Sequence, residues 1–267
     1  MNTIQFAKAI RVEALRMVYR ARASHIGGAL SMADLLAVLY FDILRINPDD
    51  PNWPERDRFI LSKGHSCVGL YATLAIKGFI PMEELESYGE DESRLMSHIS
   101  HKVPGVEFST GSLGHGLPFG CGKALAAKRG GKLWKTFVLI SDGELDEGSN
   151  WESILIAPHY ELDNLILIVD YNKIQSFGRI SEVTELHPLA EKFRAFRWEV
   201  IEIDGHDHSS IRQAMSMAGQ KRTPLCIIAH TIKGKGVDFM ENSLQWHYSS
   251  PKSEQLESAL EQIEAAS

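Results

Sequence analysis

Two apolar runs that each end on an oxygen-bearing side chain decide the fold of this chain: FVLISDG at residues 137–143 and LILIVDYN at residues 165–172. Asp142 follows the first run, Asn172 ends the second, and residues 149–160 between them have a helical pattern. A strand–helix–strand unit of this length places both strands in one parallel sheet. Asp142 and Asn172 should therefore lie together at the carboxyl edge of that sheet, where open α/β sheets bind ligands.

The other apolar runs and helical patterns alternate along the chain in the same way. Short apolar runs predict three more strands, at residues 58–61, 198–203 and 225–230. Residues 31–34 resemble a capped helix start. Helices are predicted at residues 3–23, 35–44, 67–77, 82–88, 120–128, 149–160, 188–196, 209–219 and 254–265. This alternation indicates the α/β class, with one parallel sheet and helices on both faces, in a single domain over residues 1–267.

Composition places the chain among ordinary soluble globular proteins. It has 267 residues, 44% of them hydrophobic and 24% charged, which suffices for one large α/β domain. The net charge of −7 argues against nucleic-acid binding, and no run of about 18 apolar residues predicts a membrane span. The N-terminus lacks the apolar core of a signal peptide, and three widely spaced cysteines fit neither a disulfide set nor a zinc site. A reducing, cytoplasmic location is expected.

Asp142 and Asn172 offer a carboxylate and an amide carbonyl, hard oxygen ligands that suit Mg²⁺ or Ca²⁺. Two protein ligands are too few for either ion, so a bound diphosphate is expected to complete the coordination. By itself, Asp-Gly after a strand is only a turn signal. Together with the distant Asn172 it resembles the Gly-Asp-Gly…Asn motif of thiamine diphosphate enzymes, with Ser141 in place of the first glycine.

Five short histidine and glycine motifs strengthen this resemblance. They are SHIGG at 24–28, LSKGH at 61–65, SHISHKVPGVE at 97–107, STGSLGHG at 109–116 and ENSLQWH at 241–247. Each is weak alone. In this order they closely resemble the N-terminal half of transketolases, and above all the separately encoded N-terminal subunits of many microbes. The resemblance runs from about residue 25 to residue 247, which is most of the chain.

The resemblance implies a site for thiamine diphosphate and Mg²⁺ (or Ca²⁺) and assigns its residues. Asp142, Asn172 and the backbone carbonyl of Ile174 would hold the metal. Gly111 and Leu113 match the stretch beside the aminopyrimidine ring. The residues expected to bind the cofactor are His65, Gly111, Leu113, Gly143, Asn172 and His247.

Four histidines, His25, His65, His98 and His247, are the predicted catalytic residues. Imidazole has an ordinary pKa near 6.5, which suits proton transfer around neutral pH. By the resemblance, His25 and His247 are the best candidates for proton transfer, His65 approaches the diphosphate, and His98 contacts the donor C1 hydroxyl. His101 fits the family pattern less well than His98, and His115 is expected to have a polar role beside the site.

Three other charged motifs are interpreted as structural. His206-Asp207-His208 is taken as a strand-to-helix turn with Ser209 as the helix cap, rather than as a metal site. Residues 233–236, KGKG, do not fit a P-loop and by the resemblance begin the loop that carries His247. Three acidic residues are expected to face the N-terminus of the helix at 149–160: Glu144, Asp146 and Glu147.

The function implied by the resemblance is transfer of a two-carbon ketol unit from a ketose, or ketose phosphate, to an aldose or aldose phosphate. No second α/β domain for the aminopyrimidine is predicted in the chain. A separate C-terminal pyrimidine-binding transketolase subunit is therefore expected as the partner, with two copies of each chain and no membrane association. The donor and acceptor sugars stay open, and include phosphorylated pentoses as well as sulfonated or branched sugars.

Two other function classes compete with this interpretation. One is a subunit of a different thiamine enzyme, of the dehydrogenase E1 or deoxyxylulose-phosphate synthase type. The other is a non-enzymatic relative that only binds or regulates a partner. The histidine set, especially His25, His98 and His247, favours the transketolase type. The presence of Asp142 and Asn172 together with all four histidines argues against a non-enzymatic role.

Overall fold

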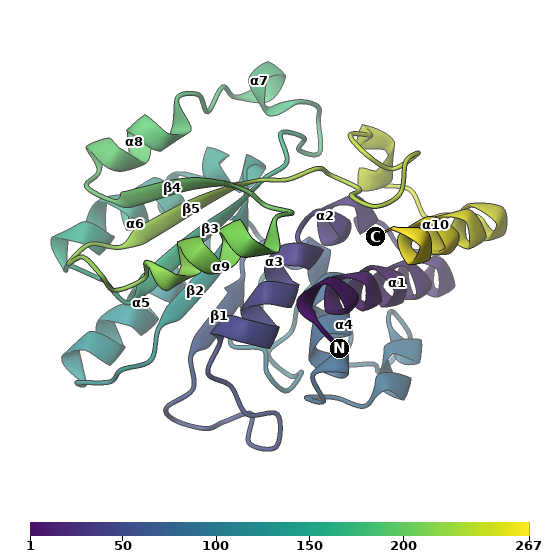
Figure 1. The fold of residues 1–267 in the computed structure, drawn as a ribbon, viewed down its shortest axis with the longest axis horizontal. Helices are drawn as coiled ribbons and strands as arrows, with labels where there is room; N and C mark the ends of the chain where they lie inside the picture. The colour runs from purple at the N-terminus through teal and green to yellow at the C-terminus, as the bar shows by residue number, and fades with distance from the viewer. Residues whose placement is uncertain (267) are drawn as a thin grey trace.

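The computed structural model describes residues 1–266 and contains one five-stranded sheet (Figure 1). Its strands are β1 (Arg58–Leu61), β2 (Thr136–Ser141), β3 (Leu165–Tyr171), β4 (Glu199–Asp204) and β5 (Leu225–His230). The order across the sheet is β1-β2-β3-β5-β4, and every neighbouring pair is parallel. The predicted α/β class and all five predicted strands are thus confirmed, each strand within one residue or two of its expected bounds.

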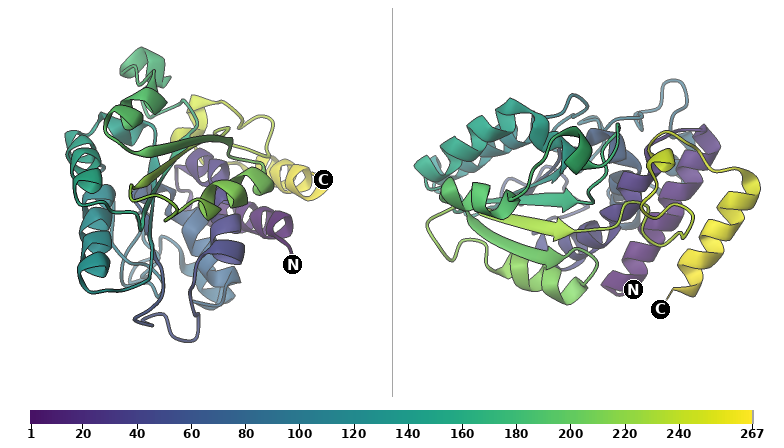
Figure 2. Two further views of the ribbon diagram at one scale, coloured as in Figure 1. Left: turned by 60° about the vertical axis from the view of Figure 1, so that its left-hand side comes forward. Right: turned by 90° about the horizontal axis from the view of Figure 1, so that it is seen from above.

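Helices cover both faces of the sheet, as Figure 2 shows in its left view. One face carries α5 (Gly116–Arg129), α6 (Gly148–His159) and α8 (Leu189–Ala195). The other carries α1 (Thr3–Ala21), α2 (Ile26–Ser31), α3 (Ala33–Val38), α4 (Cys67–Ile76), α9 (His208–Ser216) and α10 (Ser253–Ala265). Helices α1 and α10 lie side by side, so both ends of the described chain are on one side of the molecule.

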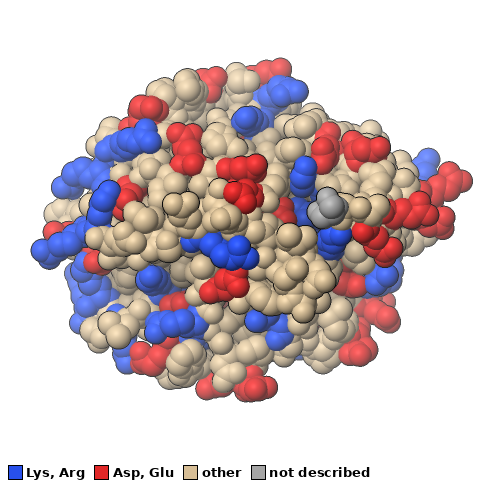
Figure 3. All heavy atoms as spheres, viewed as in Figure 1, with Lys and Arg blue, Asp and Glu red and all other residues tan. Residues whose placement is uncertain are grey.

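The central strands are continuous apolar runs because both of their faces are buried. Along β2, Phe137 and Leu139 belong to the core under α1–α4, whereas Val138 and Ile140 belong to the core under α5 and α6. This alternation repeats along β3 and β5. A parallel sheet covered on both faces requires such strands. On the surface, acidic and basic side chains are interspersed over the face shown in Figure 3.

Several helix predictions need correction. The helix expected at 35–44 is divided into α3 and a π-helical turn, Leu39–Ile43, and α2 precedes it where no helix was predicted. Ser31 does not cap a helix, because its hydroxyl donates to the Asp170 carboxylate instead. The segment at 82–88 is a 3₁₀ helix, Met82–Ser87, and a short helix α7, Ile180–Val183, was not predicted. Asp207, not Ser209, caps α9, since its carboxylate accepts from the Ser209 and Ser210 amides.

Helix α5 packs very closely on the sheet through Gly120, as the small residues at 120–128 lead one to expect. A Cβ atom added at Gly120 would lie 2.4 Å from Cγ2 of Val138 in β2. Valine is branched at Cβ and has little rotamer freedom with which to move away. By contrast, a Cβ added at Gly122, further along α5, meets nothing within 4 Å.

This difference predicts opposite effects of two alanine substitutions in one helix. Gly120→Ala should destabilise the fold by about 1–3 kcal/mol, because the added methyl overpacks α5 against β2. Gly122→Ala should be neutral or stabilising by up to about 1 kcal/mol, because alanine has the higher helix propensity. Urea unfolding of both variants measures this. Equal stability of the two would show that α5 does not approach the sheet as closely as described.

Candidate functional site

A cavity of about 220 Å³ lies at the carboxyl edge of the sheet. Its walls come from the segments that follow β1, β2, β3 and β5, together with the start of α2 and the loops at 98–113 and 247. The ten site residues expected from the sequence all line it: His25, His65, His98, Gly111, Leu113, Asp142, Gly143, Asn172, Ile174 and His247. The topology therefore brings together residues that are far apart in the sequence.

Asp142 and Asn172 follow neighbouring strands whose ends are level, because Ser141 pairs with Asp170 in the register of β2 and β3. The Asp142 carboxylate is buried and accepts from the Gly143 amide at 2.8 Å and from the Lys173 amide. Burial, followed by the nearby Asp170 carboxylate, raises the pKa of Asp142 to about 6. A cation bound here would offset that desolvation, so the carboxylate fits a metal-ligand role.

The amide of Asn172 is oriented by its neighbours. Its Nδ2 donates to Oδ2 of Asp170 at 3.4 Å, and its Oδ1 accepts from the Ile174 amide at 3.2 Å. The Ile174 carbonyl is also in the cavity wall and accepts from Nζ of Lys233 at 2.9 Å. Asn172 and Ile174 thus provide two oxygens that a cation can bind, and a positively charged ammonium already contacts one of them.

Two buried lysines of the cavity were not predicted as site residues. Lys63 donates to the Asp170 carboxylate and, at 3.1 Å, to the Gly28 carbonyl. Lys233 contacts the Ile174 carbonyl and, at 2.9 Å, Nδ1 of His247. Burial, followed by the charge of Lys63, lowers the pKa of Lys233 to about 8. The KGKG segment is therefore more than the start of a loop, since its first lysine reaches the cavity. The available sequence signal was a lysine next to glycine directly after a strand.

The four predicted histidines gather around His25. Its ring centroid lies 4.9 Å from that of His247, 5.2 Å from that of His65 and 6.4 Å from that of His98. The His25 amide donates to the His247 carbonyl at 3.0 Å, which ties the start of α2 to the loop after β5. Nδ1 of His25 is buried and has no hydrogen-bond partner among the described residues 1–266. A polar atom of this kind is available to a ligand.

Three of these histidines do not have the ordinary pKa that the sequence analysis assumed. Burial lowers the pKa of His25 to about 4, with further contributions from His98 and Lys233. Burial and then Lys233 lower the pKa of His247 to about 3. Burial also brings the pKa of His65 well below its usual value, helped by Lys63. At pH 7 these rings are therefore neutral and able to accept a proton or a hydrogen bond.

The glycines of the cavity allow close approach of the chain. A Cβ at Gly64 would lie 2.3 Å from the Thr110 carbonyl oxygen, so the segment carrying His65 can pass the loop at 110 only with glycine at this position. Gly111 lies against the ring of His98, where an added Cβ would be 3.4 Å from Cδ2.

Some polar residues near the cavity are not where the sequence analysis placed them. Glu144 does not face the N-terminus of α6, because its buried carboxylate accepts from the Ser62 hydroxyl and, at 2.9 Å, from the Gly114 amide. Asp146 accepts from Nε2 of Gln175 at 3.1 Å. His115 is exposed and outside the cavity wall, with its ring at 3.0 Å from the Leu113 carbonyl. His101 is also exposed and contacts the Ser109 hydroxyl at 2.7 Å.

The motif His206-Asp207-His208 forms no metal site. Both rings contact the carboxylate of Asp34, and within residues 1–266 no three His, Cys, Asp or Glu side chains are grouped as metal ligands. No helix in this part of the chain is long and apolar enough to cross a membrane.

Comparison with known proteins agrees with the geometry of the cavity. The family model described as the transketolase, thiamine diphosphate binding domain matches residues 3–264. One of the two chains of an apulose-4-phosphate transketolase from Phocaeicola vulgatus, named as a subunit, is 44% identical over 254 residues, which are 95% of this chain and 90% of that protein. A 6-deoxy-6-sulfo-D-fructose transketolase subunit from a Clostridium species is 40% identical over 97% of this chain and 94% of its own length.

Solved structures extend the comparison. The crystal structure of transketolase from Campylobacter jejuni superposes with a TM-score of 0.94 at 33% identity. The match covers 99% of this chain and 43% of the C. jejuni chain, so the present chain corresponds to less than half of that protein. The chain belongs to the transketolase family, through its thiamine diphosphate-binding domain.

Proposed function

We propose that this chain is the diphosphate-binding subunit of a two-chain transketolase, which transfers a two-carbon ketol unit from a ketose to an aldose. One observation carries the proposal: a single cavity has the oxygens of Asp142, Asn172 and Ile174 in its wall together with four histidines. Oxygen ligands suit a metal-bound diphosphate, and neutral imidazoles suit the hydroxyl groups of a sugar.

Mg²⁺ is proposed to lie between Asp142, Asn172 and the Ile174 carbonyl and to bind the diphosphate of thiamine diphosphate. Lys63 and Lys233 bring positive charge to the same wall of the cavity, which favours a strongly anionic ligand. The buried, destabilised ammonium of Lys233 gains a counterion when the diphosphate is present. When bound, thiamine diphosphate supplies the carbanion chemistry of the reaction.

The histidines are proposed to handle protons of the sugar hydroxyls. Because the pKa values of His25 and His247 are lowered to about 4 and about 3, their rings can accept a proton as a carbon–carbon bond breaks. The unpartnered Nδ1 of His25 is the best-placed acceptor. His65 is proposed to contact the diphosphate, and His98 to donate a hydrogen bond to the donor C1 hydroxyl.

The substrates are proposed to be ketose and aldose phosphates or related anionic sugars. The proposal is supported by two relatives named for apulose-4-phosphate and for 6-deoxy-6-sulfo-D-fructose, which both carry a terminal anionic group. These relatives are similar to the present chain over most of its length and are named as subunits. A separate pyrimidine-binding subunit, with two copies of each chain, is the proposed partner. The buried, unpaired Cys67, Cys121 and Cys226 suit a reducing cytoplasm.

The metal assignment predicts a large effect of Asp142→Asn on cofactor binding. Loss of a hydrogen-bond partner of a metal ligand typically costs about 10–100-fold in affinity, so loss of the ligand charge itself should cost at least as much. Asn172→Ala should act in the same direction. Asp146→Asn is the matched control, since Asp146 is exposed in the same turn and outside the cavity wall. Calorimetry with Mg²⁺ and thiamine diphosphate measures all three. Unchanged affinity of the first two variants would rule out this metal site.

The substrate assignment predicts that His98→Ala lowers kcat or raises the KM of the donor sugar and leaves thiamine diphosphate affinity nearly unchanged. Removing a positioned proton-transfer or hydrogen-bonding group typically costs about 10²–10⁴-fold in rate. His101→Ala is the control, because His101 is exposed and contacts Ser109 instead of the cavity. Steady-state kinetics of the reconstituted enzyme decide the matter. Wild-type kinetics in the His98 variant would remove this residue from the mechanism.

The partner assignment predicts that the purified chain shows no ketol transfer, even with saturating thiamine diphosphate and Mg²⁺. Adding the pyrimidine-binding subunit should restore activity and slow amide hydrogen exchange in residues 233–250, because that loop carries both Lys233 and His247. A coupled transferase assay and exchange mass spectrometry follow the two events. Turnover by the homogeneous single chain would disprove the two-chain arrangement.

A further inference from the structure

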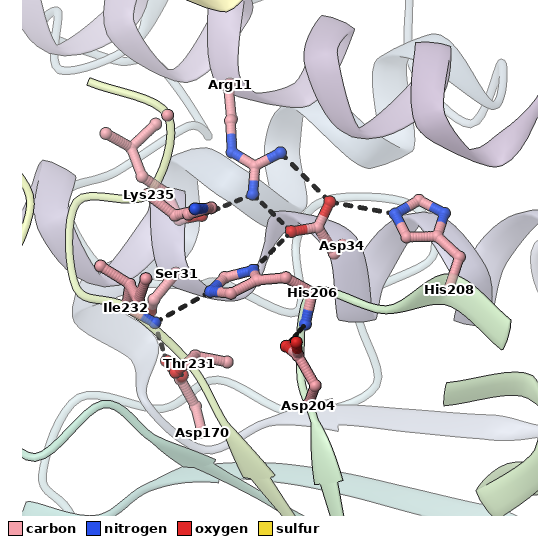
Figure 4. A network of polar contacts seen from close by, with 12 residues as sticks. Arg11, Ser31, Asp34, Asp170, Asp204, His206, His208, Thr231, Ile232 and Lys235 are labelled. Carbon is pink, nitrogen blue, oxygen red and sulfur yellow. Dashed lines mark hydrogen bonds and ion pairs between the residues drawn. The ribbon is translucent and has the colours of Figure 1, made fainter. Parts of the chain in front are cut away.

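A buried polar cluster lies beside the cavity and is not part of the proposed chemistry (Figure 4). Asp34 of α3 accepts from Arg11 of α1, with its Oδ2 at 2.6 Å from Nη2 of the guanidinium. Nδ1 of His206 lies 2.7 Å from the same Oδ2, and Nε2 of His208 lies 3.0 Å from Oδ1. Burial alone would raise the pKa of Asp34, but Arg11 and the two histidines bring that pKa well below its ordinary value. The carboxylate is therefore ionised and already neutralised by Arg11.

The second nitrogen of His206 points the other way. Nε2 accepts a hydrogen bond from the backbone amide of Ile232 at 2.9 Å. A ring nitrogen that accepts cannot carry a proton, so the proton of neutral His206 must be on Nδ1, where it is donated to Asp34. His206 is thus a rigid link between the Asp34–Arg11 pair and the chain that follows β5. His208 contacts the same carboxylate but makes no contact with that chain segment.

We call residues 231–236, which leave the sheet after β5, the strap. Its amides are held one after another: Thr231 donates to the Tyr171 carbonyl at 3.2 Å, Ile232 to His206, and Gly234 to the Gly27 carbonyl at 3.0 Å. The strap has left the β-ladder at this point, so the imidazole takes over as acceptor from the neighbouring strand. Figure 4 shows Ile232 between His206 and the Thr231–Asp170 contact.

Lys233 follows Ile232 directly and is the strap residue that lines the cavity. Its Nζ reaches the Ile174 carbonyl and His247, both at 2.9 Å. The direction of this side chain depends on the orientation of the peptide between Ile232 and Lys233. The hydrogen bond from Ile232 to His206 anchors the strap immediately before that peptide.

We propose that His206 is a positioning residue for Lys233: anchored on Asp34, it holds the Ile232 amide and so directs Lys233 into the diphosphate end of the cavity. This rests on the proposed function in one respect only, namely that Lys233 faces a bound diphosphate. The Asp34–Arg11 pair supplies the fixed point, since it joins α1 to α3 inside the protein.

Two conservative variants separate the contacts of His206. In His206→Asn the side-chain amide can replace Nδ1 and still donate to Asp34, but nothing accepts from Ile232. In His206→Gln the longer amide can replace Nε2 and accept from Ile232, but the donor to Asp34 is displaced. His208→Ala is a further control, because it removes a contact of Asp34 and leaves the strap alone.

The readouts are amide hydrogen exchange of residues 231–236 and affinity for inorganic pyrophosphate with Mg²⁺, both measured on the full chain. In His206→Asn, exchange of the strap should quicken and pyrophosphate affinity should fall by about 3- to 30-fold, the range of one lost hydrogen bond. His206→Gln and His208→Ala should match the wild type in both readouts. Wild-type exchange or affinity in His206→Asn, or equal losses in His206→Asn and His206→Gln, would overturn the proposal.

Two outcomes need separate treatment. If His206→Asn does not fold, nitrogen NMR of the wild-type imidazole decides: the Nδ1–H tautomer supports the link to Ile232, and the Nε2–H tautomer overturns it. If the wild-type chain and its pyrimidine-binding partner together bind no pyrophosphate, the proposed function of the cavity fails. The exchange of the strap then still tests the role of His206 in isolation.

Discussion

The site depends on one buried carboxylate, Asp170 in β3, which has 0% of its surface exposed. Lys63, Ser31 and Thr231 all donate to it, and Nδ2 of Asn172 lies 3.4 Å from it. These partners come from four separate segments: after β1, in α2, after β5 and after β3. Burial would raise the pKa of Asp170, but the Lys63 ammonium and the hydroxyl donors lower it. A buried ion pair is tolerated only when its remaining hydrogen bonds are satisfied, so the four segments must stay together.

The register of the parallel sheet supplies the second constraint. Asp170 pairs with Ser141 of β2 on one side and with Ala229 of β5 on the other. Three strands therefore end at the same level, and the residues after them face a common edge. The metal ligands proposed here follow β2 and β3, and the strap with Lys233 follows β5. A shift of one strand by a single residue would move its side chains to the other face of the sheet and separate these groups.

The charges in the cavity suit an anionic ligand. Lys63 is balanced by Asp170, whereas Lys233 lies against a carbonyl and a neutral imidazole, where burial lowers its pKa to about 8. His25, His65 and His247 are kept neutral by burial and by these lysines. The lysines thus have two effects: they offer positive charge to a diphosphate, and they keep the nearby imidazoles in the proton-accepting form. The sequence analysis assumed ordinary imidazoles because a pKa shift depends on neighbours that are distant in the chain.

The sequence by itself determined the class of fold, the five strands and the residues that form the cavity. Apolar runs and motifs are local patterns, and in a parallel sheet the ends of strands necessarily meet at one edge. The tertiary structure alone decided the strand order, the roles of Lys63, Lys233 and Asp170, and the directions of Ser31, Glu144 and His206. A buried charged or polar side chain takes its partner from whatever the fold places beside it, and in this protein those partners are mostly remote in sequence. For example, Ser31 is 139 positions from Asp170, and Asp34 is 172 positions from His206.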